Sequence, residues 1–261
     1  MGRVISIANQ KGGVGKTTTA INLGASLAVA ERRTLVIDCD PQGNATSGFG
    51  IRKEAGRPSI YDCLVNGHAV SDAIRREVHF GCLDVLPASR DLAGAEVELI
   101  EWPNRERVLR RAIEPIRSDY DYVLIDSPPS LGLLTLNALV AADTVLIPIQ
   151  CEFYALEGLS QLLNTVRIVQ RSVNTGLGIE GVLLTMYDTR LNLSKQVAGE
   201  AREYFGAKVF RTFIPRNVRL AEAPSFGKPI ALYDLLSTGA RGYLSLAREI
   251  LQGDEEKRPV G

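Results

Sequence analysis

The amino-acid sequence predicts an α/β fold with a doubly wound, largely parallel sheet flanked by helices. Short apolar runs, typical of buried strands, alternate with helix-length segments along nearly the whole chain. The first apolar run leads into a glycine-rich loop and then a helix, which is the order of a phosphate-binding turn. At 261 residues, 45% of them hydrophobic, the chain can bury one substantial core. We expect a single domain over residues 1–252 and a short polar tail over residues 253–261.

The glycine-rich loop follows an expected strand at residues 4–8 and leads into an expected helix at residues 18–30. Its glycines let backbone N–H groups turn inward on an anion, and the helix N-terminus adds the positive end of its dipole. Lys16 supplies a positive charge for the β- and γ-phosphates of a nucleotide, and the Thr17 hydroxyl is a ligand for Mg²⁺. The expected phosphate cradle is formed by Gly12, Gly13, Val14, Gly15, Lys16, Thr17 and Thr18.

Carboxylates follow two further apolar runs that we expect to be strands. Asp38 and Asp40 come after residues 34–37, and Asp126 comes after residues 122–125. Ligands of a parallel sheet bind at the carboxyl ends of its strands, so these side chains are expected beside the glycine-rich loop. The pair Asp38 and Asp40 suits a magnesium-associated role and the orientation of an attacking water, and Asp126 suits the carboxylate that holds Mg²⁺ through water.

The remaining elements continue the alternation. Residues 49–118 read as a helix-rich excursion with little chemistry, and the lone histidines His68 and His79 are expected to be structural or surface residues. Further helices are expected at residues 60–65, 69–77, 105–116, 133–142, 155–171, 192–205 and 235–251. Further strands are expected at residues 83–87, 144–149, 181–186 and 209–214, followed by a loop at residues 215–225.

The glycine-rich loop departs from the usual P-loop pattern, because Gln10 stands at a glycine position and Lys11 precedes the glycines. The variant Lys-Gly-Gly-x-Gly-Lys-Thr-Thr resembles the deviant P-loop of chromosome- and plasmid-partitioning ATPases. Three other motifs resemble the ParA or Soj branch of that family: Asp-x-Asp-Pro-Gln-Gly from Asp38, Asp-Ser-Pro-Pro-Ser from Asp126, and residues 214–229. The resemblance extends from Val4 to about Leu251 and implies an ATPase that uses ATP and Mg²⁺.

The resemblance also implies roles for single residues. It makes Lys11, Lys16 and Asp40 the catalytic residues: Lys11 reaches the phosphates of a second subunit, and Asp40 helps to position water. Thr17, Asp38 and Asp126 are then the residues associated with the metal, and residues 126–132 look like a switch segment that Gly132 lets move. Adenine is expected against Met186, Asp188, Pro215 and Asn217, although Asp188 stands where some relatives have asparagine.

Charge is unevenly distributed along the chain. The formal net charge is zero, which argues against a globally basic nucleic-acid-binding protein. Between residues 190 and 228, however, eight basic residues stand against three acidic ones, a net charge of +5. Composition alone fits an ordinary solvated face as well as a surface for a phosphate backbone. The resemblance favours the second, with Arg190, Lys195, Arg216 and Arg219 as the DNA-binding residues.

The partners implied by the resemblance form a cycle. ATP pairs two subunits into a homodimer, the dimer binds double-stranded DNA without regard to sequence, and a ParB-type DNA-binding protein stimulates hydrolysis. No apolar run reaches the length of a membrane-spanning helix and the first residues do not read as a signal segment, so no membrane partner is expected. We expect a cytoplasmic, nucleoid-associated protein.

Three other functions share features with this sequence. A MinD-type regulator of division-site placement is the main alternative, but such proteins end in a basic amphipathic helix, and residues 252–259 have no apolar face. An iron–sulfur protein of the nitrogenase-iron-protein type needs paired cysteines, and the four cysteines here are scattered. A bacterial tyrosine kinase would carry a tyrosine-rich tail, whereas the last tyrosine, Tyr243, lies within an expected helix.

Overall fold

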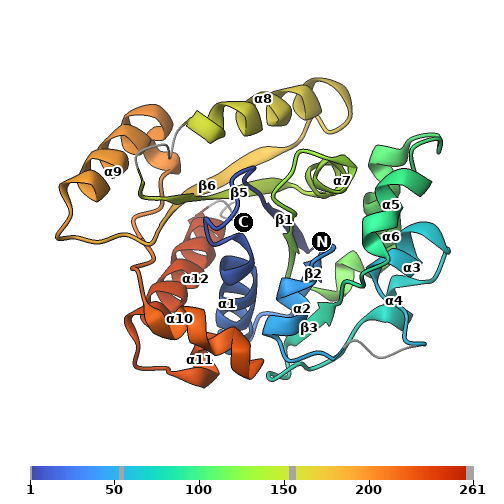
Figure 1. Ribbon diagram of the computed structural model, residues 1–261, viewed down its shortest axis with the longest axis horizontal. Coiled ribbons are helices and arrows are strands. Elements are labelled where there is room, and N and C mark those ends of the chain that lie inside the picture. The colour runs from blue at the N-terminus through green and yellow to red at the C-terminus, as the bar shows by residue number, and fades with distance from the viewer. Residues whose placement is uncertain (1, 53–55, 153–156, 257–261) are drawn as a thin grey trace.

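A parallel β-sheet forms the centre of the computed structural model, which describes residues 2–52, 56–152 and 157–256 (Figure 1). The sheet has six strands in the order β3-β2-β4-β1-β5-β6, and every pairing between them is parallel. The strands are β1 (Arg3–Ile7), β2 (Thr34–Asp38), β3 (Leu83–Leu86), β4 (Tyr122–Asp126), β5 (Thr144–Gln150) and β6 (Gly178–Thr185). The predicted fold class is confirmed.

Helices cover both faces of the sheet because successive strand residues point to opposite sides. In β2, Leu35 and Ile37 join one apolar cluster, whereas Val36 joins the other. The first cluster is completed by α3 (Ile60–Val65), α4 (Val70–Ala73), α5 (Leu92–Glu98), α6 (Val108–Ile113), α7 (Leu133–Ala141), α8 (Glu157–Ser172) and α9 (Asn192–Phe205). The second is completed by α1 (Lys16–Val29), α2 (Asn44–Gly48), α10 (Val218–Glu222), α11 (Ile230–Tyr233) and α12 (Thr238–Glu256).

The register of the central strands brings their carboxyl ends together. Asp126, the last residue of β4, pairs with Ile7 in β1 on one side and with Asp38 in β2 on the other. The glycine-rich loop leaves β1 at this edge and enters α1, the blue helix in Figure 1. The sheet therefore gathers at one point the loop and the carboxylates that lie far apart in the sequence.

The predicted strand at residues 209–214 is wrong. This segment makes only isolated bridges, from Val209 to Val182 in β6 and from Pro215 to Tyr187 just beyond β6. Between them, the backbone N–H groups of Arg211 and Thr212 donate to the carboxylate of Glu249 in α12, at 2.7 and 2.9 Å. The Glu249 side chain therefore accepts from the N–H groups that a strand would have donated to β6, and a continuous strand pairing does not form.

Several helix predictions were also wrong in extent. The helix predicted at residues 69–77 is only Val70–Ala73, because Ile74 is extended and Arg75 pairs with Val85. The helix predicted at residues 105–116 is divided into η1 (Arg105–Arg107), α6 and η2 (Glu114–Asp119). Pro115 lies in the first turn of η2, and its nitrogen cannot donate a helical hydrogen bond. Helices α2, α5, α10 and α11 were not predicted, nor were the short turns η3 (Gly206–Lys208) and η4 (Ala223–Phe226).

The closing helix differs from its prediction at both ends. It was expected over residues 235–251, but α12 spans Thr238–Glu256, so the first part of the expected tail is helical. Residues 257–261 lie outside the described part of the chain. The helix expected at residues 155–171 corresponds to α8, and its expected first residue, Ala155, also lies outside the described part. Among the described residues, no helix has both the length and the apolar character that a membrane crossing requires.

Candidate nucleotide-binding site

The glycine-rich loop is held in the shape of a cradle by its own backbone and by neighbouring strands. Gly13 and Gly15 have φ values of +75° and +90°, which a side chain would strain. The Asn9 side chain donates to the carbonyl of Pro148 and accepts from the Lys11 N–H, at 2.7 and 3.0 Å. The Thr185 hydroxyl at the end of β6 donates to the Val14 carbonyl at 2.8 Å. The loop is thus held in one conformation by contacts with β5 and β6.

Lys16, the first residue of α1, points back into this loop. Its side chain donates to the Lys11 carbonyl at 3.0 Å, and the residue is only 7% exposed. Burial lowers the pKa of Lys16, while the negative charges of Asp126 and Asp40 act in the opposite direction. A buried ammonium that donates to a backbone carbonyl favours an anionic ligand, such as a phosphate.

The two strand-end carboxylates differ in how they are satisfied. Asp38 is fully buried, and one of its oxygens accepts from both the N–H and the hydroxyl of Thr46, each at 2.7 Å. Burial raises the pKa of Asp38 to about 6 against these hydrogen bonds. Asp126 is equally buried, yet neither of its oxygens has a hydrogen-bond partner of good geometry within the described chain. Burial, then the charge of Asp38, raises the pKa of Asp126 well above its ordinary range, while the nearby Thr17 hydroxyl lowers it.

The carboxylate of Asp126, which has no hydrogen-bond partner among the described residues, indicates whether this site fits a magnesium ion. A buried carboxylate without a partner is costly, and a divalent cation held through water would supply the missing interactions. Magnesium typically uses one or two carboxylates together with substrate phosphates, so a cage of protein ligands is not required. The described residues contain no group of three His, Cys, Asp or Glu side chains placed to hold a metal. The donor set of Thr17 and Asp126 beside Lys16 fits Mg²⁺ with a nucleotide phosphate.

Asp40 borders the open part of the site. It is 6% exposed, and its carboxylate accepts from the N–H of Gln42 at 2.9 Å. It also lines a cavity of about 540 Å³ that the glycine-rich loop borders on one side. The opposite walls of this phosphate cavity come from α2 and η4, through Asn44, Ser47, Gly48, Pro224 and Ser225.

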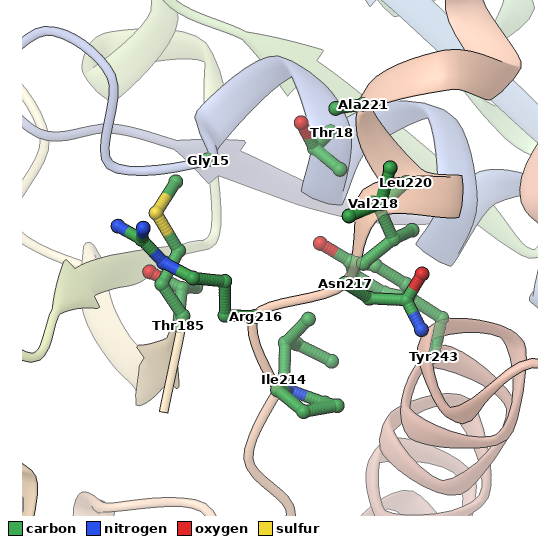
Figure 2. A pocket seen from close by; sticks show the side chains of 12 residues that line it. Gly15, Thr18, Thr185, Ile214, Arg216, Asn217, Val218, Leu220, Ala221 and Tyr243 are labelled. Carbon is green, nitrogen blue, oxygen red and sulfur yellow. The ribbon is translucent and has the colours of Figure 1, made fainter. Parts of the chain in front are cut away.

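A second cavity, of about 360 Å³, continues the phosphate cavity past the start of α1. The two share Gly15, Thr18 and Met186, and Figure 2 shows the second one between the start of α1 and the segment that carries Ile214 to Ala221. Its lining is largely apolar and ends at Tyr243 of α12, whose hydroxyl lies 3.2 Å from the hydroxyl of Thr19. An apolar pocket joined to an anion cradle has the form of a nucleotide site, with room for a base and for phosphates.

Comparison with known proteins identifies the family. A family model described as an AAA domain matches residues 2–179. The chain is 57% identical over 260 residues to the chromosome partitioning protein ParA of Myxococcus xanthus, covering 99% of this chain and 91% of the relative. It is 60% identical over 250 residues to the sporulation initiation inhibitor protein Soj of Bacillus subtilis, covering 96% of this chain and 98% of the relative. The chain belongs to the ParA/Soj family of partitioning ATPases.

A solved structure extends this comparison to the bound ligands. The cobyrinic acid a,c-diamide synthase of Mycobacterium smegmatis, with bound ATP analogue and magnesium, is 37% identical. It matches 99% of this chain and 97% of its own with a TM-score of 0.88. The predicted family and ATPase class are confirmed, and the ligands of this relative agree with the predicted cofactors, ATP and Mg²⁺.

The residues predicted to bind nucleotide in this ParA/Soj chain fall into three groups. Gly12, Gly13, Gly15, Lys16, Thr17 and Thr18 line the phosphate cavity, and Met186, Pro215 and Asn217 line the second cavity. Val14 is buried, and its carbonyl is used within the loop. Lys11 and Asp188 line neither cavity: Lys11 pairs with Glu152 at 3.4 Å, and Asp188 pairs with Arg190 at 2.7 Å.

Of the four residues predicted to bind DNA, Arg216 lines the second cavity and the other three do not. Arg190 and Arg216 both act on Asp188, whose pKa is lowered to about 2, first by hydrogen bonds from Arg190 and least by the charge of Arg216. Arg219 in α10 is bound to Glu222 at 2.9 Å and to Asp234 at 3.6 Å. Lys195 is exposed on α9. Two of the four predicted DNA-binding residues therefore have carboxylate partners in this conformation.

Sequence reasoning missed the two walls supplied by α2 and η4, and it missed Tyr243. Helices of this length have too few residues to show a periodic pattern, so no local signal marks them. Thr46 follows the Asp38 motif by three residues, but its hydrogen bonds to Asp38 depend on the turn into α2. Tyr243 is one of several buried residues on α12 and has no distinguishing neighbour in the sequence.

Proposed function

We propose that this chain is an ATP-dependent switch that dimerises, binds double-stranded DNA without sequence preference and drives chromosome or plasmid segregation. The observation that carries the proposal is the buried, unpaired Asp126 beside Lys16, at the junction of an anion cradle with an apolar cavity. We propose ATP as the nucleotide, with its phosphates on the loop and adenine in the second cavity. The switch is cytoplasmic and nucleoid-associated in this proposal.

The proposed roles in hydrolysis follow from burial and bonding. Lys16 neutralises the β- and γ-phosphates, and Thr17 and Asp126 hold Mg²⁺, with Asp38 behind them. The bound ion would stabilise the charge that develops on the transferred phosphoryl group. Asp40 lines the phosphate cavity, and one of its oxygens accepts from the N–H of Gln42, which supports it as the proposed residue that orients the attacking water. Asp38 is occupied by Thr46, which keeps it from that task.

Lys11 is the residue proposed to act across a dimer. Its ion pair with Glu152 is 3.4 Å long, and the two side chains are 36% and 47% exposed. Exposed ion pairs of this kind contribute at most about 1 kcal/mol to the free energy of folding. Lys11 can therefore exchange Glu152 for a phosphate of the partner subunit at little cost. The Gln150 side chain donates to the same Glu152, which leaves the carboxylate with a partner after Lys11 departs.

DNA binding is proposed for the dimer because one subunit offers few phosphate contacts. The side chains of Arg190 and Arg219 are 86% and 55% exposed, and their carboxylate partners are exchangeable for the same reason as Glu152. Two subunits double the number of contacts, and each phosphate contact adds to the release of counterions. A ParB-type protein, bound at its own DNA site, is the proposed stimulator of hydrolysis.

The test is light scattering with and without ATP, followed by DNA binding at several salt concentrations. The parent chain should form a dimer with ATP and bind plasmid DNA only as that dimer. Lys11→Ala should bind nucleotide as a monomer and fail to bind DNA. An ATP-dependent dimer of Lys11→Ala would contradict the role of Lys11, and DNA binding by the nucleotide-free monomer would contradict the switch.

The MinD-type alternative is not favoured by the closing helix. The apolar face of α12 is buried through Tyr243, Leu246 and Ile250, so it is not available to a bilayer. Its last described turn carries Asp254, Glu255 and Glu256, where a membrane-binding helix would be basic. Co-sedimentation of the ATP-bound protein with anionic liposomes would support the alternative.

A further inference from the structure

His79, in the loop before β3, joins two segments that are far apart in the sequence. Its Nε2 atom lies 2.9 Å from the carbonyl oxygen of Phe49 and 2.9 Å from that of Gly227. Carbonyl oxygens only accept hydrogen bonds, so Nε2 must carry the proton and donate it between them. His79 has a left-handed backbone conformation, with φ at +66°, which is uncommon for a residue other than glycine.

The two carbonyls belong to the ends of the two walls of the phosphate cavity. Phe49 is the C-terminal cap of α2, and Gly227 is the C-terminal cap of η4. Helix α2 lines the phosphate cavity through Asn44, Ser47 and Gly48, and η4 lines it through Pro224 and Ser225. A single imidazole therefore spans both walls at the point where each one ends.

The backbones of the two walls meet closely beside His79. A Cβ atom on Gly50 would lie 2.9 Å from the carbonyl oxygen of Gly227, and one on Gly227 would lie 2.5 Å from the Cα of Gly50. Both glycines also have positive φ, at +74° and +63°. Their N–H groups donate within their own walls, to Ser47 and Pro224 respectively, so these bonds do not join the walls.

The position of α2 also bears on the catalytic edge of the sheet. Thr46, within α2, binds the Asp38 carboxylate and accepts from the N–H of Ala88, at 2.7 and 2.9 Å. Asp38 in turn accepts from the N–H of Asp40 at 3.2 Å. The α2 wall is thus anchored firmly at its inner end, and His79 supplies a second anchor at the outer end, where the wall meets η4.

We propose that His79 is a positioning residue for nucleotide binding: by sharing one N–H between Phe49 and Gly227, it holds the two walls of the phosphate cavity at a fixed separation. The proposal rests on the proposed function, because it assumes that this cavity holds a nucleotide. It assigns His79 no contact with the nucleotide. Losing the clamp lets the walls separate, which speeds nucleotide release without disturbing Lys16 or Asp40.

The test uses Mg²⁺ with a fluorescent ADP analogue and a set of four variants of the full chain. His79→Ala and His79→Phe both remove the donor, and the second keeps an aromatic ring in place. His79→Gln keeps a nitrogen with two N–H groups, one for each carbonyl. His68→Ala is the matched control, because His68 is the other histidine, is also exposed and lies outside both nucleotide cavities.

The expected result is affinity for the ADP analogue about three- to tenfold weaker in His79→Ala and His79→Phe, the worth of one hydrogen bond, with faster dissociation. The KM for ATP should rise by a similar factor while kcat stays the same. His79→Gln and His68→Ala should match the parent chain, and the unfolding temperature of all nucleotide-free variants should stay near that of the parent.

Two outcomes would overturn the clamp. One is parental affinity in both His79→Ala and His79→Phe. The other is a loss that His79→Gln does not restore, or that follows a fall in unfolding temperature, since either would mark a merely structural residue. If the parent chain itself does not bind the ADP analogue with Mg²⁺, the proposed function fails, and that result is distinct from a failure of the clamp alone.

Discussion

The nucleotide cleft and the basic segment at residues 190–228 both offer charge to phosphates, but they hold that charge in opposite ways. In the cleft, Lys16 is 7% exposed and Asp126 is 0% exposed. In the basic segment, the side chains of Arg190 and Arg219 are 86% and 55% exposed. Among the described residues, Lys16 donates to a backbone carbonyl and the Asp126 oxygens have no hydrogen-bond partner, whereas Arg190 and Arg219 are already paired with carboxylates.

The difference has a consequence for how each region would bind. A buried charge has lost its water, so only a ligand that enters the cleft restores its interactions, and the energetic effect of each group is large. An exposed pair exchanges one partner for another at little cost and is screened by salt. The cleft is therefore suited to one specific ligand, and the basic segment to many weak, interchangeable contacts.

Lys16→Gln should cause the largest loss, that of nucleotide binding in the cleft. It removes the buried charge that faces the phosphates while keeping a side chain of similar length, so ATP affinity should fall about 100-fold or more. Isothermal titration calorimetry measures this directly. Lys208→Gln makes the same chemical change on the exposed turn η3 and should leave ATP affinity unchanged. ATP binding retained in Lys16→Gln would overturn the assignment of the loop.

Asp40→Ala should separate hydrolysis from binding within the cleft. Because Asp40 is proposed to orient water and not to hold phosphate, the rate of hydrolysis should fall about 100-fold while ATP affinity and dimerisation persist. Single-turnover phosphate release is the measurement, and Asp72→Ala in α4 is the exposed control. Turnover at the parent rate, with DNA and partner present, would move the role to Asp38 or Asp126.

The double variant Arg190→Glu, Arg219→Glu tests whether the exposed basic segment at residues 190–228 binds DNA. It should weaken plasmid binding at least about tenfold and flatten its dependence on salt, because phosphate contacts are lost while ATP-dependent dimerisation stays intact. Arg107→Glu, Arg110→Glu makes the same change in net charge on an exposed surface of η1 and α6 and should have a much smaller effect. Equal losses in both double variants would show that net charge alone, without a defined surface, governs DNA binding.

The sequence was sufficient for the central sheet because its strands are short runs of buried aliphatic residues with a clear beginning and end. It was misleading at residues 209–214, where Val209, Phe210 and Ile214 have the pattern of a strand. The N–H groups there bind Glu249, which lies more than 30 residues further along the chain. No local pattern could report an interaction at that distance in sequence.

The candidate site shows the same limit. Motifs placed the loop, Asp38, Asp40 and Asp126 correctly at one edge of the sheet, because strand ends are readable in the sequence. They could not distinguish Asp38, satisfied by Thr46, from Asp126, which has no such partner. They also could not predict the role of His79, because its two acceptors are backbone carbonyls that lie 30 residues before it and 148 residues after it in the sequence.

The last prediction concerns stability in place of binding, and it depends on Asp126, whose oxygens have no hydrogen-bond partner among the described residues. Burial raises its pKa, so the folded chain favours the protonated carboxyl. The corresponding stability is complete below the ordinary pKa of 3.8 and is lost as the pH rises through the raised value. Asp126→Asn removes the titrating group, so the nucleotide-free variant should be about 1–3 kcal/mol more stable than the parent at alkaline pH, with a smaller gain at pH 5.

Urea unfolding at several pH values measures this effect, and Asp84→Asn provides the contrast. Asp84 is also buried, but its carboxylate accepts from Arg76, from the Tyr120 hydroxyl and from the N–H of Glu77, so its replacement should destabilise the chain. Adding Mg²⁺ and ADP should stabilise the parent strongly and Asp126→Asn weakly, because the group that awaits the ion is gone. If Asp126→Asn is as destabilising as Asp84→Asn without nucleotide, Asp126 has a partner within the fold, and the contrast between an unsatisfied cleft and a satisfied surface does not hold.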